Sequence, residues 1–195
     1  TLSRELSELD RDVVEFTSVL TDKGIDYVIV SGYVAILTGR SRSTEDIDIV
    51  LEPLSETELE GLANRLSEEG YWGMAMPLDE MAGMLGGGDR LRVAEDGEIY
   101  PNFEVWLASN KLEREALSTA ITAEIGDYEV SISSIELQIA YKLRLAKGAG
   151  TTDGKDFEDA LHLYLTFEDQ FKSEQLEVYV EQLGVEDYYV ELRGV

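Results

Sequence analysis

The sequence predicts an α/β fold, with a β-sheet, flanking helices and a C-terminal helical lobe. Short aliphatic runs with strand character alternate with amphipathic helical segments over residues 1–132. From residue 133 onward the periodic segments have only the spacing of helices. We therefore expect a core at 1–132 and a helical lobe at 133–195 packed on that core.

Elements of the first third are marked by clear start and stop signals. Apolar residues at helical spacing end at Gly24, Asp46 to Leu51 alternates acid with aliphatic, and Pro53 and Ser55 are typical of a helix start. The expected elements are a helix at 5–23, a strand at 27–30, a short helix from the Ser31-Gly32 turn to about 38, a strand at 46–51 and a helix from 55 to about 69.

The middle of the chain is harder to interpret. Residues 71–102 contain methionines and the run Gly86-Gly87-Gly88, for which we expect a strand or hairpin and a mobile loop. Further on, we expect a strand at 101–107, a helix at 109–121 and a hairpin or paired strands at 123–132. The rest is expected to be helical, with a helix at 133–147 capped by Ser133 and Ser134, a helix at 153–167 capped by Asp153, and two helices within 173–193.

Composition limits the chemistry available to the chain. It has no cysteine and one histidine, which excludes disulfides and thiolate zinc sites and leaves oxygen as the expected metal ligand. No run approaches the roughly 18 apolar residues of a membrane span, and the chain opens with charged, helix-like sequence. We expect a cytoplasmic protein with no membrane partner.

The net charge of -25 is extreme for 195 residues, yet the acids are interleaved with periodic apolar residues rather than gathered in a tail. At molar salt the Debye length is about 3 Å, so the repulsion between these acids would be largely screened. We interpret the acidity as adaptation to a salt-saturated cytoplasm such as that of a halophilic archaeon. An acidic mimic of nucleic acid is the alternative.

Asp46 and Asp48 are the strongest candidate metal ligands. Residues two apart in a strand project from one face, so these carboxylates lie side by side while Ile47 and Ile49 point into the opposite layer. A divalent cation would relieve the repulsion between them, and Mg²⁺ prefers oxygen ligands. The alternative is a strand whose acids simply face water.

The residues around this pair resemble a known signature. An aliphatic strand, Ser31-Gly32, a short helix, Gly-Arg-Ser-Arg-Ser-Thr at 39–44 and then Asp-Ile-Asp-Ile resemble the nucleotidyltransferase superfamily, and most closely its minimal members that include abortive-infection toxins. One departure is Tyr33, which follows Ser31-Gly32 where the family has a plain pair of small residues. The resemblance implies a mixed sheet and a third carboxylate on a later strand, for which Glu104 matches in order. The alternatives are that Glu104 is a strand acid that simply faces water, or that Asp96 or Glu98 is the third carboxylate.

A second block resembles the helical motif of the same group. It covers 135–143 and 154–161, where a helix lysine precedes a Lys-Asp-x-x-Asp helix start. Lys142 flanks the apolar stripe of its helix and would reach a phosphate, or it would extend along the helix shoulder into water. Arg40, Arg42 and several lysines in these windows favour a local anion pocket. His162 lies among leucines and is interpreted as a packing residue.

The resemblance implies a metal-dependent transfer of a nucleoside monophosphate from a nucleoside triphosphate. Asp46, Asp48 and Glu104 would bind Mg²⁺ or Mn²⁺, and Glu104 would help deprotonate an acceptor hydroxyl. The residues expected at the nucleotide phosphates are Ser31, Gly32, Arg42, Thr44, Lys142 and Asp156. The acceptor, whether RNA, protein or a small molecule, a cognate antitoxin and the oligomeric state stay open.

Two other classes of function remain. A catalytically silent nucleotide-binding or toxin-antitoxin regulatory protein would keep the fold and bind triphosphate without turnover. A plain salt-adapted interaction protein would bind neither metal nor nucleotide. Measuring metal and triphosphate binding separately from turnover distinguishes the three.

The charge predicts a salt requirement for folding. Lowering potassium chloride from molar to tens of millimolar lengthens the screening distance from about 3 Å to more than 10 Å, so the acids repel one another and the cooperative transition is lost. Circular-dichroism melts across this range measure the effect. A melting temperature that stays constant would contradict the haloadaptation argument.

Overall fold

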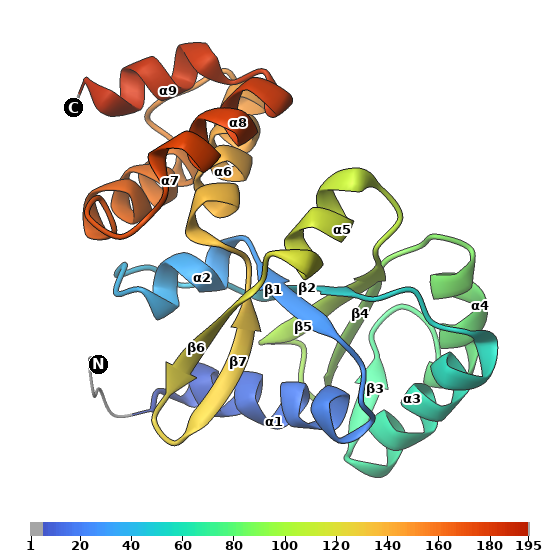
Figure 1. The fold of residues 1–195 in the computed structure, drawn as a ribbon. Helices are drawn as coiled ribbons and strands as arrows, with labels where there is room; N and C mark the ends of the chain where they lie inside the picture. The colour runs from blue at the N-terminus through green and yellow to red at the C-terminus, as the bar shows by residue number, and fades with distance from the viewer. Residues whose placement is uncertain (1–5, 195) are drawn as a thin grey trace. The chain divides into compact units, whose positions relative to one another are not determined.

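A computed structural model describes residues 6–194 and divides them into two units. The first comprises the residues up to Val30 together with Thr44–Ile132, and the second comprises Ser31–Ser43 and the residues from Ser133 onward. The first unit contains the sheet (Figure 1), and the second is helical. The predicted α/β class with a mixed sheet and flanking helices is confirmed.

One mixed sheet runs through the first unit. Over residues 6–194 it has seven strands, in the order β3-β4-β5-β2-β1-β7-β6. Their bounds are β1 Tyr27–Val30, β2 Asp46–Leu51, β3 Tyr71–Gly73, β4 Leu91–Glu95, β5 Asn102–Leu107, β6 Ile121–Ile125 and β7 Tyr128–Ile132. The β-branched and alternating segments of the sequence thus form the strands expected of them.

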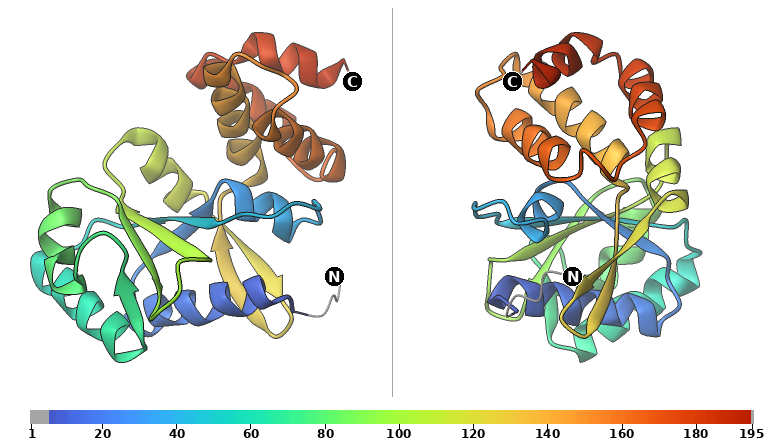
Figure 2. Two further views of the ribbon diagram at one scale, coloured as in Figure 1. Left: turned by 180° about the vertical axis from the view of Figure 1, so that it is seen from behind. Right: turned by 60° about the vertical axis from the view of Figure 1, so that its left-hand side comes forward.

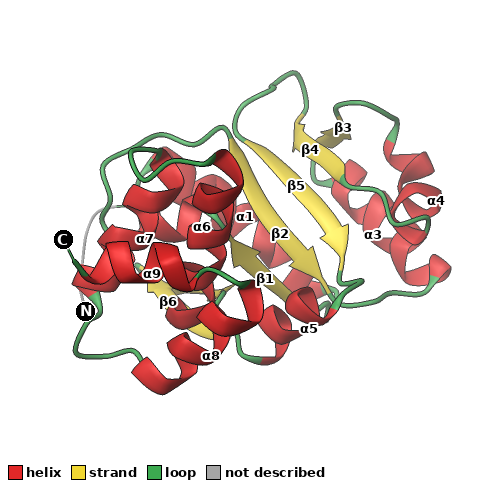
Figure 3. Cartoon of the chain, turned by 90° about the horizontal axis from the view of Figure 1, so that it is seen from above, coloured by secondary structure: helices red, strands yellow, loops and turns green. Residues whose placement is uncertain are grey.

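The central strands β2 and β5 are parallel neighbours (Figure 3). Their register places Asp46 opposite Asn102 and Asp48 opposite Glu104. On its other side β5 pairs with the antiparallel strand β4, in which Arg92 stands opposite Glu104. Because paired residues project from the same face of a sheet, these side chains share one face.

The opposite face of the sheet carries the core. Phe103 of β5 stacks on Phe16 of α1 (Glu8–Asp22) with ring centroids 4.0 Å apart, and Tyr71 meets both rings edge-on. Helix α3 (Glu56–Glu68) buries its apolar side and begins at a capping box between Ser55 and Glu58. Helix α5 (Lys111–Ser118) lies on the face that bears Asp48 and Glu104, since its Glu113 accepts a hydrogen bond from Trp106.

The second unit consists of helices, of which α6 and α7 lie side by side (Figure 2). Its elements are α2 Gly32–Leu37, α6 Ile135–Ala149, α7 Lys155–Thr166, α8 Ser173–Leu183 and α9 Glu186–Arg193. The short helix α2 packs on α7, although about 120 residues of sequence separate them. Buried Leu143 and Leu163 belong to the core of this unit.

Two details differ from the sequence-based expectations. Residues 71–102 contain, besides β3 and β4, a 3₁₀ turn at Leu78–Glu80 and a helix α4 at Met81–Gly86, where we expected a loop. Burial of Met81 and Leu85 stabilises this helix despite its glycines. Ser134 occupies the N-cap position of α6, but its side chain makes no capping hydrogen bond, and Gly154 rather than Asp153 is the N-cap of α7.

Within residues 6–194, the helices are too short or too polar to cross a membrane.

Candidate functional site

Strand β2 presents its two aspartates on one face. Ile47 and Ile49 are completely buried on the other side of the strand, while Asp46 and Asp48 are partly accessible. The alternation of acid and aliphatic residues therefore fixes which way the carboxylates point. Glu104 lies in register with Asp48 on β5, whereas Asp96 and Glu98 lie outside that strand.

Asp46 is held by neighbouring polar groups. The Asn102 side-chain amide donates to Oδ1 of Asp46 at 2.8 Å and to the Glu45 carbonyl at 3.2 Å. The Thr44 hydroxyl donates to the carbonyl oxygen of Asp46 at 3.0 Å. Asn102 is buried, so its amide is held in place and in turn fixes the orientation of the Asp46 carboxylate. No local sequence signal singles out Asn102 as a partner of Asp46.

The residues of this face suit a hard divalent cation. Three carboxylates, from Asp46, Asp48 and Glu104, project from one face of two adjacent strands, and oxygen is the ligand that Mg²⁺ and Mn²⁺ prefer. Within residues 6–194, no three carboxylate or imidazole groups converge as a ready-made metal-ligand set. Glu104 instead lies beside Arg90, with Oε2 3.7 Å from the guanidinium.

Arg90 and Trp106 flank Glu104. The guanidinium carbon of Arg90 lies 3.9 Å from the centroid of the Trp106 ring, and the indole N–H donates to Glu113 at 3.0 Å. Burial alone would raise the pKa of Glu113, but hydrogen bonds from Ser109, Trp106 and Asn110 lower it, which keeps this carboxylate ionised. Helix α5 therefore anchors the ring on which Arg90 rests.

The second unit holds the turn at Ser31 in an unusual conformation. Ser31 has φ 65° and ψ -130°, and no other non-glycine residue in the described part of the chain has positive φ. The side chain of Gln138, on α6, accepts from the Ser31 amide at 3.1 Å and donates to the Ser31 carbonyl at 2.6 Å. Gln138 is buried, so its amide clamps the strained residue from both sides.

An ion-pair cluster around Asp159 lies in the same unit. The Asp159 carboxylate is completely buried and lies 2.6 Å from Arg40, 3.7 Å from Arg42 and 2.9 Å from Lys142. Lys142 also donates to Asp156 at 2.7 Å. Asp156 and Asp159 share one face of α7 because they are three residues apart. Asp156 and Asp159 are the two acids of the Lys-Asp-x-x-Asp motif, in which we had predicted no role for Asp159.

This cluster changes the interpretation of the basic residues. Lys142 is 2% exposed, so the alternative in which it extends into water is wrong. Arg40, Arg42 and Lys142 face Asp159 together with Asp156 and Glu158, which balances the three positive charges within the unit. His162 contacts the Thr38 carbonyl at 3.2 Å and so joins α7 to α2, as a packing residue would.

The other predicted phosphate-binding residues occupy different places. Gly32 is the first residue of α2 and is buried. Thr44 lies beside Asp46 in the first unit. Arg42 is mostly buried beside Asp159. The structure thus brings Arg42, Lys142 and Asp156 together around Asp159. It brings Asp46, Asp48 and Glu104 together on the sheet, with Thr44 just before β2.

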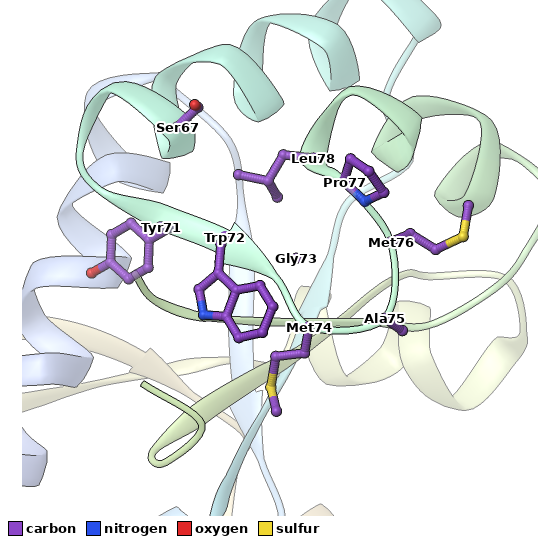
Figure 4. A pocket seen from close by; sticks show the side chains of 9 residues that line it. All are labelled: Ser67, Tyr71, Trp72, Gly73, Met74, Ala75, Met76, Pro77 and Leu78. Carbon is purple, nitrogen blue, oxygen red and sulfur yellow. The ribbon is translucent and has the colours of Figure 1, made fainter. Parts of the chain in front are cut away.

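A hollow of about 430 Å³ lies at the β3 edge of the sheet (Figure 4). Trp72 and Met74 line it on one side, and Pro77 and Leu78, which follow in the chain, also line it. Gly73 is required there, because a Cβ would lie 2.0 Å from the Met76 carbonyl oxygen. None of the residues predicted for metal or phosphate lines this hollow.

Comparison with known proteins points to one family. Residues 9–188 match the model of a family described as "Nucleotidyl transferase of unknown function (DUF2204)". No curated protein matches the sequence.

Solved structures share the fold at low identity. An antigenic nucleotidyltransferase-like protein from Paracoccidioides brasiliensis is 19% identical, with a TM-score of 0.57 over 96% of this chain and 94% of that one. The antibiotic-resistance factor ANT(2'')-Ia is 15% identical, with a TM-score of 0.56 over 96% and 98%. The lincosamide antibiotic adenylyltransferase LnuA is 16% identical, with a TM-score of 0.52 over 82% and 98%.

The Gln138 clamp predicts a stability effect. Gln138→Met keeps the length of the side chain but leaves the Ser31 amide and carbonyl without this partner, which should lower the unfolding free energy by about 2–4 kcal/mol. Gln182→Met, at an exposed position of α8, should change it by less than about 0.5 kcal/mol. Denaturant titration measures both.

Strain at Ser31 adds a second expectation. Ser31→Gly removes the side chain that disfavours positive φ, so Gln138→Met should cost less in that background than in the parent. Equal costs in the two backgrounds would show that the clamp does not hold strain.

The Asp159 cluster predicts that Lys142 is structurally important. Lys142→Met removes one partner of a buried carboxylate and should lower the unfolding free energy by about 3–5 kcal/mol. Lys172→Met, at the exposed start of α8, serves as the matched control. A Lys142→Met protein as stable as the parent would contradict this role.

Proposed function

This chain belongs to the family of nucleotidyl transferases of unknown function, and we propose that it transfers a nucleoside monophosphate from a nucleoside triphosphate to a hydroxyl acceptor. The observation that carries the proposal is the register of β2 and β5, which aligns Asp48 with Glu104 and leaves Asp46 on the same face. We propose that these three carboxylates hold Mg²⁺ or Mn²⁺.

In the proposed reaction all three carboxylates bind the cation, and Glu104 also acts as a base. When bound, the cation would neutralise phosphate charge and orient the triphosphate. Asp46 and Asp48 would hold it together with Glu104, and the Asn102 amide keeps Asp46 in place. Glu104 accepts the proton of the acceptor hydroxyl while the oxygen of that hydroxyl forms a bond to the α-phosphorus. The bond from the α-phosphorus to the bridging oxygen breaks, and that oxygen leaves with pyrophosphate.

The contacts predicted for the phosphates complete the proposal. They come from Ser31, Gly32, Arg42, Thr44, Lys142 and Asp156. Lys142 and Asp156 already neutralise each other, so any contact of theirs with phosphate would have to compete with that ion pair. Assignment to the abortive-infection toxins with a cognate antitoxin, a cytoplasmic location and the halophilic archaeal origin also stay proposals.

A catalytically silent nucleotide-binding protein is the second candidate. Two observations favour it: Glu104 is engaged by Arg90, and Tyr33, which departs from the family pattern, is buried directly after the Ser31 turn. Such a protein would bind metal and triphosphate without releasing pyrophosphate.

The metal site predicts a specific loss on mutation. Asp46→Asn with Asp48→Asn removes the charged oxygens and should abolish saturable Mn²⁺ binding without unfolding the chain. Calorimetric titration with Mn²⁺ measures binding. Pyrophosphate release from four labelled triphosphates, incubated with candidate RNA, protein and small-molecule acceptors in concentrated potassium chloride, measures turnover.

The sheet offers a matched control. Glu124 and Glu129 are exposed and stand directly opposite each other on β6 and β7, so Glu124→Gln with Glu129→Gln also removes two neighbouring carboxylates. This variant should bind Mn²⁺ as the parent does. Equal binding by the Asp46/Asp48 variant and the parent would place the metal elsewhere, whereas binding without turnover by the parent would favour the silent alternative.

A further inference from the structure

The guanidinium of Arg90 is held in a fixed position next to Glu104. Its carbon lies 3.9 Å from the centre of the Trp106 ring, and that ring is anchored to α5 through Glu113. A guanidinium that rests on an aromatic face keeps its N–H donors in its own plane, available to a partner at its edge. Arg90 is therefore oriented for binding by the ring beneath it.

The ion pair of Arg90 leaves hydrogen-bonding capacity unused. Its nearest atom is 3.7 Å from Oε2 of Glu104, which is too long for a hydrogen bond, and the Arg90 side chain is 47% exposed. An arginine has five N–H donors in a fork that matches a phosphate. Arg92 is also exposed and stands opposite Glu104 in the register of β4 and β5.

The position of these arginines relates them to the acceptor. Across the sheet the order is β4, β5, β2, so Arg92, Glu104 and Asp48 form one row. In the proposed reaction Asp46 and Asp48 serve the triphosphate, and Glu104 takes the proton of the acceptor hydroxyl. The acceptor therefore lies at Glu104, and the groups beyond Glu104, away from β2, are those of β4.

Charge then limits the chemistry of the acceptor. The chain has 16 lysines and arginines against 41 acids, so two exposed arginines close to a predicted catalytic carboxylate are a marked local departure. They would repel a polycationic acceptor and attract an anionic one. Resting on the proposed function, we propose that Arg90 and Arg92 bind a phosphate group of the acceptor, so that the substrate is a hydroxyl compound that also carries a phosphate ester.

Direct binding tests this assignment. The donor site is first saturated with Mg²⁺ and an α,β-methylene triphosphate, at the salt concentration where the parent is folded. Ribose 5-phosphate, ribose and a short oligoribonucleotide with a free 3′ hydroxyl are then titrated by calorimetry. The parent should bind both phosphate-bearing probes and not ribose. Tighter binding of the oligoribonucleotide indicates a nucleic-acid end, and tighter binding of ribose 5-phosphate indicates a small phosphate ester.

Substitutions assign the binding to the arginines. Arg90→Gln and Arg92→Gln should each weaken the phosphate-bearing probes by roughly tenfold or more, because each removes a charge-assisted contact, while the affinity for the triphosphate stays within twofold. Arg90→Lys keeps the charge but loses the planar fork, so its affinity should be intermediate. Arg65 of α3 is half-buried and paired with Glu69, and Arg65→Gln should match the parent.

The outcomes separate the two proposals. Phosphate-bearing probes that fail to bind the parent, or bind the glutamine variants as tightly as the parent, would overturn the acceptor assignment while triphosphate binding still supports the proposed function. Loss of triphosphate affinity in Arg90→Gln would overturn it as well, by placing that arginine at the donor. If the parent binds neither metal nor triphosphate, both the proposed function and the acceptor assignment are contradicted.

Discussion

Parallel pairing of β2 with β5 is the constraint on which the candidate site depends. A shift of one residue in that register would turn Glu104 away from the face that carries Asp46 and Asp48. Buried Ile47, Ile49 and Phe103 on the other face prevent such a shift, because it would expose them to water. The stacking of Phe103 on Phe16 therefore contributes to the chemistry of the opposite face by fixing the register.

Scarce positive charge is the second constraint, and the chain concentrates it at a few places. Arg40, Arg42 and Lys142 surround one buried carboxylate, Asp159. Because a buried charge without partners is very costly, this arrangement ties the short segment around α2 to α6 and α7. The same segment begins with Ser31, whose strained backbone is fixed by Gln138. The ion pairs of Asp159 and the hydrogen bonds of Gln138 thus both hold the 13-residue segment Ser31–Ser43 in place.

Much of the fold could be predicted from the sequence because its signals are local. The aliphatic run of β1, the alternation in β2 and the capping box before α3 each need only neighbouring residues. Helix α4 could not be predicted in this way, since its glycines favour a loop and only tertiary burial of Met81 and Leu85 stabilises it. The family resemblance led us to expect Glu104 as a third carboxylate on a later strand. Its register opposite Asp48 could not be predicted, because register between distant strands has no local signal.

The partners of Lys142 could not be predicted from the sequence of its own helix. Its place beside an apolar stripe was consistent with a lysine that extends into water or one that reaches a phosphate, and both interpretations assumed a partner outside the protein. The structure provides internal partners, Asp156 and Asp159, from a helix that follows 13 residues later in the chain. Removing such a lysine would weaken activity through folding alone. A loss of activity in a Lys142 variant therefore carries no information about phosphate binding unless the stability of that variant is measured as well. Arg90 is exposed and contacts the Trp106 ring from the surface, so the effect of its substitution on binding is not confused with an effect on folding.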